Sequence, residues 1–137
     1  MILDFPGSND VTYKLLKKSL DATSLRHNAI SNNISNMNTR NYKANRVKFE
    51  DELKKALGKD EIKLNATNKR HFGISSIDNI KPKTVKDKKT QMNSDGNNVD
   101  VDLEMTNLAA NQIKYNALIE QTNKKLRTFG YIINGGR

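Results

Sequence analysis

VDLEMTNLAANQIKYNALIEQTNKKLRTFGYII, residues 101–133, is the stretch that decides the fold. Its apolar side chains recur in alternating steps of three and four residues, the heptad period of a helix with one apolar stripe. The stripe consists of Val101, Met105, Leu108, Gln112, Tyr115, Ile119, Thr122, Leu126, Phe129 and Ile133. Asp100 or Asp102 is the expected N-cap, and acidic residues at the start with basic residues near the end suit the helix dipole. The pattern predicts one long C-terminal helix.

A second heptad stripe predicts a long N-terminal helix over about residues 9–37. The stripe consists of Tyr13, Leu16, Leu20, Thr23, His27, Ile30, Ile34 and Met37. Ser8, Asn9 and Asp10 are candidate N-caps. The end of this helix is less defined, because the Asn- and Ser-rich run 31–39 offers side chains that compete for backbone hydrogen bonds.

Two such helices predict a mainly α fold in which the terminal arms pair as a coiled-coil-like hairpin. A pair of helices covers only one stripe on each partner, and several apolar residues lie off the stripes: Leu15, Leu25, Ile113 and Leu118. Two interpretations stay open, a hairpin closed on itself and a pair that also packs against other chains. In the second, the assembly seam comprises Leu16, Leu20, Ile30, Ile34, Met37, Met105, Leu108, Tyr115, Ile119, Leu126 and Phe129.

The middle of the chain is less regular. The pattern of apolar residues over about 46–57 predicts a short amphipathic helix, which is expected to end before Gly58. Residues of about 59–98 form a basic, loop-rich insert, in which 62–64, 74–77 and 84–86 are candidate short strands. We expect all of residues 1–137 to form a single domain.

Composition excludes several classes of protein. The chain has 137 residues, a net charge of +9 and no cysteine, which excludes a disulfide scaffold, a cysteine-ligated zinc site and cysteine catalysis. No apolar run approaches the length of a membrane span. The first seven residues lack the basic and long apolar regions of a cleavable signal peptide, so any export is expected to use another route.

No group of residues has the spacing of a catalytic or metal site. His27 and His71 are far apart in the sequence, and the run 95–102 lacks the spacing of a calcium loop. We therefore expect no enzyme activity, no cofactor, no bound metal and no small-molecule substrate. The basic stretch 59–90 leaves one alternative function, binding of nucleic acid or anionic lipid, although Phe72 is the only aromatic residue there for base stacking.

Two motifs, read together, resemble a known family. NNISNMNTRNYKA at 32–44 is similar to the NNIANxNTxGYK signature of flagellar rod, hook and hook-associated proteins, and DGNNVDVDLEM at 95–105 resembles the DGNNVDxDxEM signature of proximal rod proteins. Residues 64–71 are similar to an LxxTxxxH stretch of the same group. The motif residues are Asn33, Asn36, Asn38, Thr39, Tyr42, Asp95, Gly96, Asn97, Asn98 and Asp100.

The resemblance implies a structural subunit of the bacterial flagellar basal-body rod, in the cell envelope beyond the cytoplasmic membrane. The implied partners are copies of the chain, other rod proteins, the membrane-ring and export-gate base, and the flagellar type III export apparatus, with no nucleic acid. Two adjacent residues depart from the family pattern, since Arg40-Asn41 stands where Pro-Gly is common. Asn tolerates a positive φ, so we expect Asn41 to replace the glycine in the turn.

Overall fold

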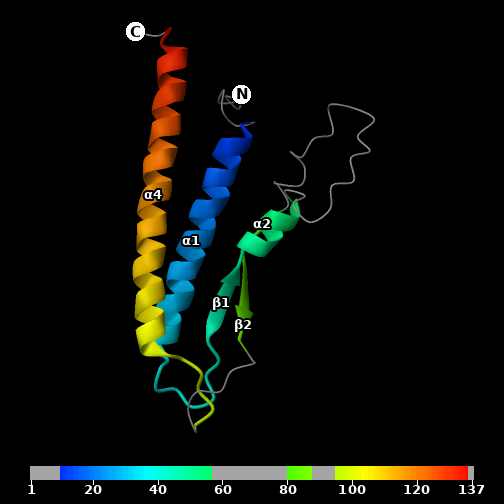
Figure 1. The fold of residues 1–137 in the computed structure, drawn as a ribbon, viewed down its shortest axis with the longest axis vertical. Coiled ribbons are helices and arrows are strands. Elements are labelled where there is room, and N and C mark those ends of the chain that lie inside the picture. Colours follow the sequence, from blue (N-terminus) through cyan, green and yellow to red (C-terminus); the bar gives the residue numbers. More distant parts are fainter. Residues whose placement is uncertain (1–9, 57–79, 88–94, 136–137) are drawn as a thin grey trace, which may run out of the picture.

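Two long antiparallel helices dominate the computed structural model, which describes residues 10–56, 80–87 and 95–135 (Figure 1). α1 spans Val11–Ser35 and α4 spans Val101–Ile133. They lie side by side, and α1 is placed between α4 and a smaller unit of strands β1 and β2 with helix α2. The predicted mainly α fold with paired terminal helices is confirmed.

The two long helices begin at the aspartates expected to cap them. The Asp10 carboxylate accepts hydrogen bonds from the backbone N–H groups of Thr12 and Tyr13, at 2.8 and 3.1 Å. The Asp100 carboxylate accepts from the N–H of Leu103 at 3.1 Å, so Asp100 and not Asp102 is the N-cap of α4. Each cap satisfies N–H groups that have no partner inside the helix.

The region predicted as one short helix contains a strand and a helix. Strand β1, Asn45–Lys48, pairs antiparallel with β2, Lys83–Lys86, and α2 begins only at Glu50 and ends at Ala56. The predicted start at about residue 46 is therefore wrong, because pairing with a segment far along the chain satisfies the backbone of 45–48. The candidate strand at 84–86 is confirmed within β2, and the candidates at 62–64 and 74–77 lie outside the described residues.

The core lies on the side of α1 that faces this small unit. Ala22 from α1, Phe49 between β1 and α2, and Ile80 before β2 form a buried cluster, against which Leu15 and Leu53 pack. The Lys18 ammonium donates to the Ile80 carbonyl at 2.7 Å. Leu15, which lies off the predicted stripe, is thus covered within the same chain.

None of the described helices combines the length and apolar character needed to cross a membrane. Within residues 10–56, 80–87 and 95–135, no three His, Cys, Asp or Glu side chains gather into a set that could hold a metal ion.

Phe49→Ala should remove the largest apolar side chain of the core cluster. Because Phe49 is buried, we expect a loss of about 3–5 kcal/mol in the free energy of unfolding. Urea unfolding followed by far-UV circular dichroism measures this loss. Val85→Ala is the control on the exposed face of β2 and should change the free energy of unfolding by less than about 1 kcal/mol. Equal losses in the two variants would contradict the placement of the core.

Candidate functional site

The two sequence motifs meet at the end of the helical pair, where α1 ends and α4 begins (Figure 1). The fully buried Asn97 amide nitrogen donates to three carbonyls of the turn after α1, those of Asn36, Met37 and Thr39, at 2.9–3.0 Å. Its oxygen accepts from the N–H of Val99 at 2.7 Å. One side chain therefore holds the segment that leaves α1 against the segment that enters α4.

Asn98 joins the same corner to the small sheet. Its amide oxygen accepts from the N–H of Ala44 at 2.7 Å, and its amide nitrogen donates to the carbonyl of Asp87 at 2.8 Å. Ala44 precedes β1 and Asp87 follows β2, so Asn98 bridges the end of the sheet where the paired strands meet this corner. Because these backbone groups are satisfied by a side chain, the corner can be buried without regular secondary structure.

Asn41 and Gly96 form the tightest contact of the corner. Asn41 has a φ of +58°, as expected for a residue that replaces the family glycine, and Gly96 has a φ of +81°. A Cβ on Gly96 would lie 2.5 Å from the Asn41 amide oxygen. The N–H of Asn41 donates to the Asp95 carbonyl at 3.1 Å, and the Lys43 ammonium donates to the Gly96 carbonyl at 2.8 Å.

A buried ionic network lies one turn inside α4. The Glu104 carboxylate has no exposed surface and accepts from the Arg46 guanidinium and from the Asn33 amide nitrogen, the latter at 3.1 Å. Asn33, also fully buried, donates to the Asn45 carbonyl at 2.9 Å and accepts from the Asn45 N–H at 2.8 Å. Glu104 is one of the acidic residues at the start of α4 that were expected to interact favourably with the helix dipole. Its side chain is buried against α1 and β1 instead, because Arg46 and Asn33 compensate its charge.

Tyr42 completes this network at its edge. Its hydroxyl donates to the Asn33 oxygen at 3.3 Å and accepts from the Asn45 amide nitrogen at 3.1 Å. Burial, together with the nearby negative charge of Glu104, raises the pKa of Tyr42, so its hydroxyl stays protonated as the donor that Asn33 requires.

Three polar residues of α4 contact α1 or its cap, although the stripe predicted for this contact is mainly apolar. Glu104, Asn111 and Lys125 share one heptad phase and contact α1 through Asn33, the Thr23 carbonyl and Asp10 respectively. Each precedes by one residue a position of the predicted stripe, 105, 112 and 126. The three polar side chains face inward because each meets a partner of complementary charge or hydrogen-bonding capacity.

The end of the contact near the chain termini is aromatic and ionic. Lys125 lies 2.8 Å from the Asp10 carboxylate and over the Phe129 ring, which meets Tyr13 edge to face. The hydrogen bond from Lys125 is the main cause that lowers the pKa of Asp10, and the capping bonds add to it. The cap therefore stays ionised at neutral pH and fixes α1 against α4.

The structure distributes the proposed seam and motif residues between interior and surface. Among seam residues, Ile30 is buried, six are half-buried (Leu16, Leu20, Ile34, Leu108, Ile119 and Phe129), and four are exposed (Met37, Met105, Tyr115 and Leu126). Among motif residues, Asn33, Asn97 and Asn98 are buried, five are half-buried (Asn36, Tyr42, Asp95, Gly96 and Asp100), and Asn38 and Thr39 are exposed.

Sequence reasoning missed Glu104 and Asn111 as interior residues, and it missed Arg46 as the half-exposed partner of Glu104. Glu104 and Asn111 are seven residues apart, so a heptad search that admitted polar residues would find them. Arg46 carries no such signal, since only the tertiary contact with Glu104 reveals its role.

Gly96→Ala should destabilise the corner, because the new Cβ meets Asn41 and the backbone keeps a positive φ. We expect a loss of more than about 1 kcal/mol, measured by urea unfolding. Gly135→Ala is the matched control, since Gly135 also has a positive φ but open space around it. A loss for Gly96→Ala no larger than that of the control would exclude a steric role for Asn41.

Arg46→Met should leave the buried Glu104 carboxylate without its cation. The expected cost is about 3–5 kcal/mol in the free energy of unfolding. Adding Glu104→Gln should recover part of it, because the neutral amide no longer needs a counter-charge. Lys48→Met, an exposed neighbour on β1, is the control. Additive losses in the double variant would show that Arg46 and Glu104 are not coupled.

Comparisons with known proteins agree with the residues gathered at this corner. The family described as "Flagella basal body rod protein" matches residues 19–43. The chain is 38% identical to flagellar basal body rod protein FlgB of Bacillus subtilis over 92% of this chain and 95% of that protein. It is 38% identical to FlgB of Borreliella burgdorferi, over 84% of this chain and 87% of that protein, and 26% identical to FlgB of Salmonella typhimurium, over 93% and 96%.

These relatives are matched over nearly their whole length, and the matched family segment contains Asn33, Asn36 and Tyr42 of the corner. No observation favours the nucleic-acid or lipid alternative, for which the structure describes only residues 80–87 of the basic stretch. The chain belongs to the FlgB family of flagellar basal body rod proteins, and it is a structural, non-enzymatic subunit of that rod.

Proposed function

We propose that this rod subunit joins its neighbours through the outer face of α4, together with the seam residues that the helical pair leaves uncovered. The observation that carries the proposal is the set of large apolar side chains exposed along this helix. Ile113 is 71% exposed, and Leu103 and Met105 are also exposed. Apolar patches of this kind on a soluble chain mark surfaces that pack against other proteins.

The C-terminal turns of α4 extend this surface. Lys125 pairs with Asp10 at the start of α1, and α4 continues to Ile133, about 12 Å further at the rise of an α-helix. Tyr131, Ile132 and Ile133 are all more than half exposed there. In this proposal they contact neighbouring subunits, as do the exposed seam residues Met37, Met105, Tyr115 and Leu126.

The neighbours in this proposal are further copies of the chain, other rod proteins and the membrane-ring and export-gate base. Membership of a basal body rod family supports assembly with other basal-body components. In the same proposal the subunit leaves the cytoplasm through the flagellar type III export apparatus without a cleaved signal peptide, and acts in the cell envelope beyond the cytoplasmic membrane.

Ile113→Asp tests the outer face of α4. The side chain is exposed, so we expect the thermal midpoint of the purified chain to change by no more than a few degrees. Incorporation into basal bodies should fall at least tenfold, because a charge would be buried in the contact without a partner. Isolated basal bodies from cells that make only the variant are quantified for the subunit, alongside motility.

Asn28→Asp adds the same charge at an exposed polar position of α1, away from this face, and should assemble more fully than Ile113→Asp. Normal incorporation of Ile113→Asp would exclude this face as an assembly surface.

A further inference from the structure

The hydrogen bonds of the small sheet show which of its backbone groups face outward. β1 and β2 pair antiparallel with Arg46 opposite Val85, and the N–H of Asp87 donates to the Ala44 carbonyl at 2.8 Å. In an antiparallel pair, hydrogen-bonded positions alternate with positions whose N–H and C=O groups point away from the partner strand. Residues 83, 85 and 87 of this segment therefore turn these groups toward β1, and residues 84 and 86 turn theirs away from it.

The outer edge of β1 is closed by α1. Asn45 lies opposite Lys86 and turns its own backbone groups outward. Its N–H donates to the Asn33 amide oxygen at 2.8 Å, and its C=O accepts from the Asn33 amide nitrogen at 2.9 Å. A carboxamide offers the same donor and acceptor as a peptide group, so Asn33 takes the place of a neighbouring strand at this position.

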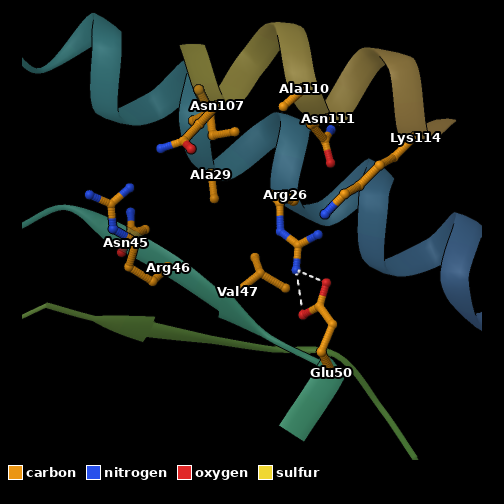
Figure 2. A pocket seen from close by; sticks show the side chains of 11 residues that line it. Arg26, Ala29, Asn45, Arg46, Val47, Glu50, Asn107, Ala110, Asn111 and Lys114 are labelled. Atoms are coloured by element: carbon orange, nitrogen blue, oxygen red, sulfur yellow. Dashed lines mark hydrogen bonds and ion pairs between the residues drawn. The ribbon is translucent and has the colours of Figure 1, made fainter. Parts of the chain in front are cut away.

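The same edge is closed again at the end of β1. Arg26 of α1 makes a bidentate ion pair with Glu50, two residues after β1, at 2.8 Å (Figure 2). The space that remains between α1, β1 and α4 is a pocket of about 280 Å³. Because side chains from α1 bridge to β1 and to the residues that follow it, this edge leaves no room for a further strand.

The outer edge of β2 is different. β2 lies on the far side of β1 from α1 and α4 (Figure 1). All four residues of β2 are exposed, and the outward backbone groups of Thr84 and Lys86 have no hydrogen-bond partner within the part of the chain that the structure describes. A row of such groups on an edge strand is a template for pairing with an extended segment of another chain.

Lysines along this edge restrict the chemistry of the incoming segment. Lys81, Lys83 and Lys86 are exposed, and Asp87 is the only acidic residue of 80–87. On neighbouring strands, opposite charges are stabilising and like charges are destabilising, so an acidic strand fits best. Both described strands of this chain carry only basic charges, which disfavours pairing with the same strands of a second copy.

We propose that the outer edge of β2 binds an acidic, extended segment of a different basal-body protein, which adds to the sheet as a third strand. The N–H groups of Thr84 and Lys86 donate to the incoming backbone, and their C=O groups accept from it. Acidic side chains of that segment lie beside the lysines. This contact is separate from the α4 surface of the proposed function and does not rest on it.

Photocross-linking in isolated basal bodies identifies what covers this edge. The full-length chain carries p-benzoylphenylalanine in place of Thr84, in place of Lys86, or, as a control on the exposed side of α2, in place of Lys54. We expect both β2 positions to form an adduct with one acidic segment of a different protein, and the α2 position to form none with that segment. Failure of both β2 positions to form an adduct overturns the inference, as does an adduct with this chain, with a second copy, or with a neutral or basic segment.

The cross-linked segment is then made as a synthetic peptide and titrated into the purified full-length chain. Thr84→Pro removes an outward N–H and leaves the ladder with β1 intact, so its melting midpoint should stay within a few degrees of wild type. The dissociation constant for the peptide should rise about tenfold or more. Val85→Pro is the matched control at the next position, because it removes an N–H that faces β1 and should lower the melting midpoint.

Lys86→Glu tests the charge of the edge, with Lys54→Glu on α2 as its control. We expect Lys86→Glu to raise the dissociation constant about fivefold or more, and Lys54→Glu to leave it unchanged. Failure of the wild-type chain to bind the peptide overturns the inference, as does wild-type affinity in Thr84→Pro or Lys86→Glu. A melting midpoint of Thr84→Pro as low as that of Val85→Pro overturns the assignment of the outward groups.

Ile113→Asp separates this inference from the proposed function. The substitution lies on α4, so the variant should bind the peptide with the same dissociation constant as wild type. Normal incorporation of Ile113→Asp into basal bodies, with peptide binding retained, overturns the α4 surface alone. Loss of incorporation by Ile113→Asp, in basal bodies where the β2 positions form no adduct, overturns the third strand alone.

Discussion

The carboxylate of Glu104, wholly removed from solvent, imposes the constraint on which the rest of the structure depends. A buried charge is tolerated only where a counter-charge and hydrogen-bond donors surround it. Here the counter-charge comes from Arg46 on β1 and one donor from Asn33 on α1. α1 and β1 must therefore both meet the first turns of α4, which are distant from them in sequence, and this sets how α1, β1 and α4 are placed relative to one another.

Next to this network, the carboxamide side chains of Asn97 and Asn98 fix the corner at which the chain passes from α1 and the small sheet into α4. Asn97 and Asn98 bind backbone groups of the turn after α1 and of both strands at one end of the small sheet, so side chains do there what a regular ladder does elsewhere. An amide can donate and accept at once, which explains why one short motif closes a corner that contains no regular element. The direction in which α4 leaves the corner follows from these bonds and from the Asp100 cap.

Polar residues on the inner side of α4 have a consequence for the outer side. Because Glu104, Asn111 and Lys125 face α1, the apolar Met105 and Leu126 are turned outward and remain exposed. A chain that had only to fold alone would gain by burying these side chains. In the assembly that we propose, the subunit has a second requirement, since it presents apolar surface to neighbours, and polar contacts within the helical pair leave that surface available.

The sequence by itself determined the two long helices, a few candidates for each N-cap, the positive φ of Asn41, and the family, because helix periodicity, capping and turn chemistry act over a few neighbouring residues. Tertiary structure decided which phase of α4 faces inward, since Glu104 and Asn111 are favourable inside only where Arg46, Asn33 and the Thr23 carbonyl meet them. It also decided that residues 45–48 form a strand, because their partner lies at 83–86. Local pattern cannot supply these pairings, for each depends on a contact between segments that only the folded chain brings together.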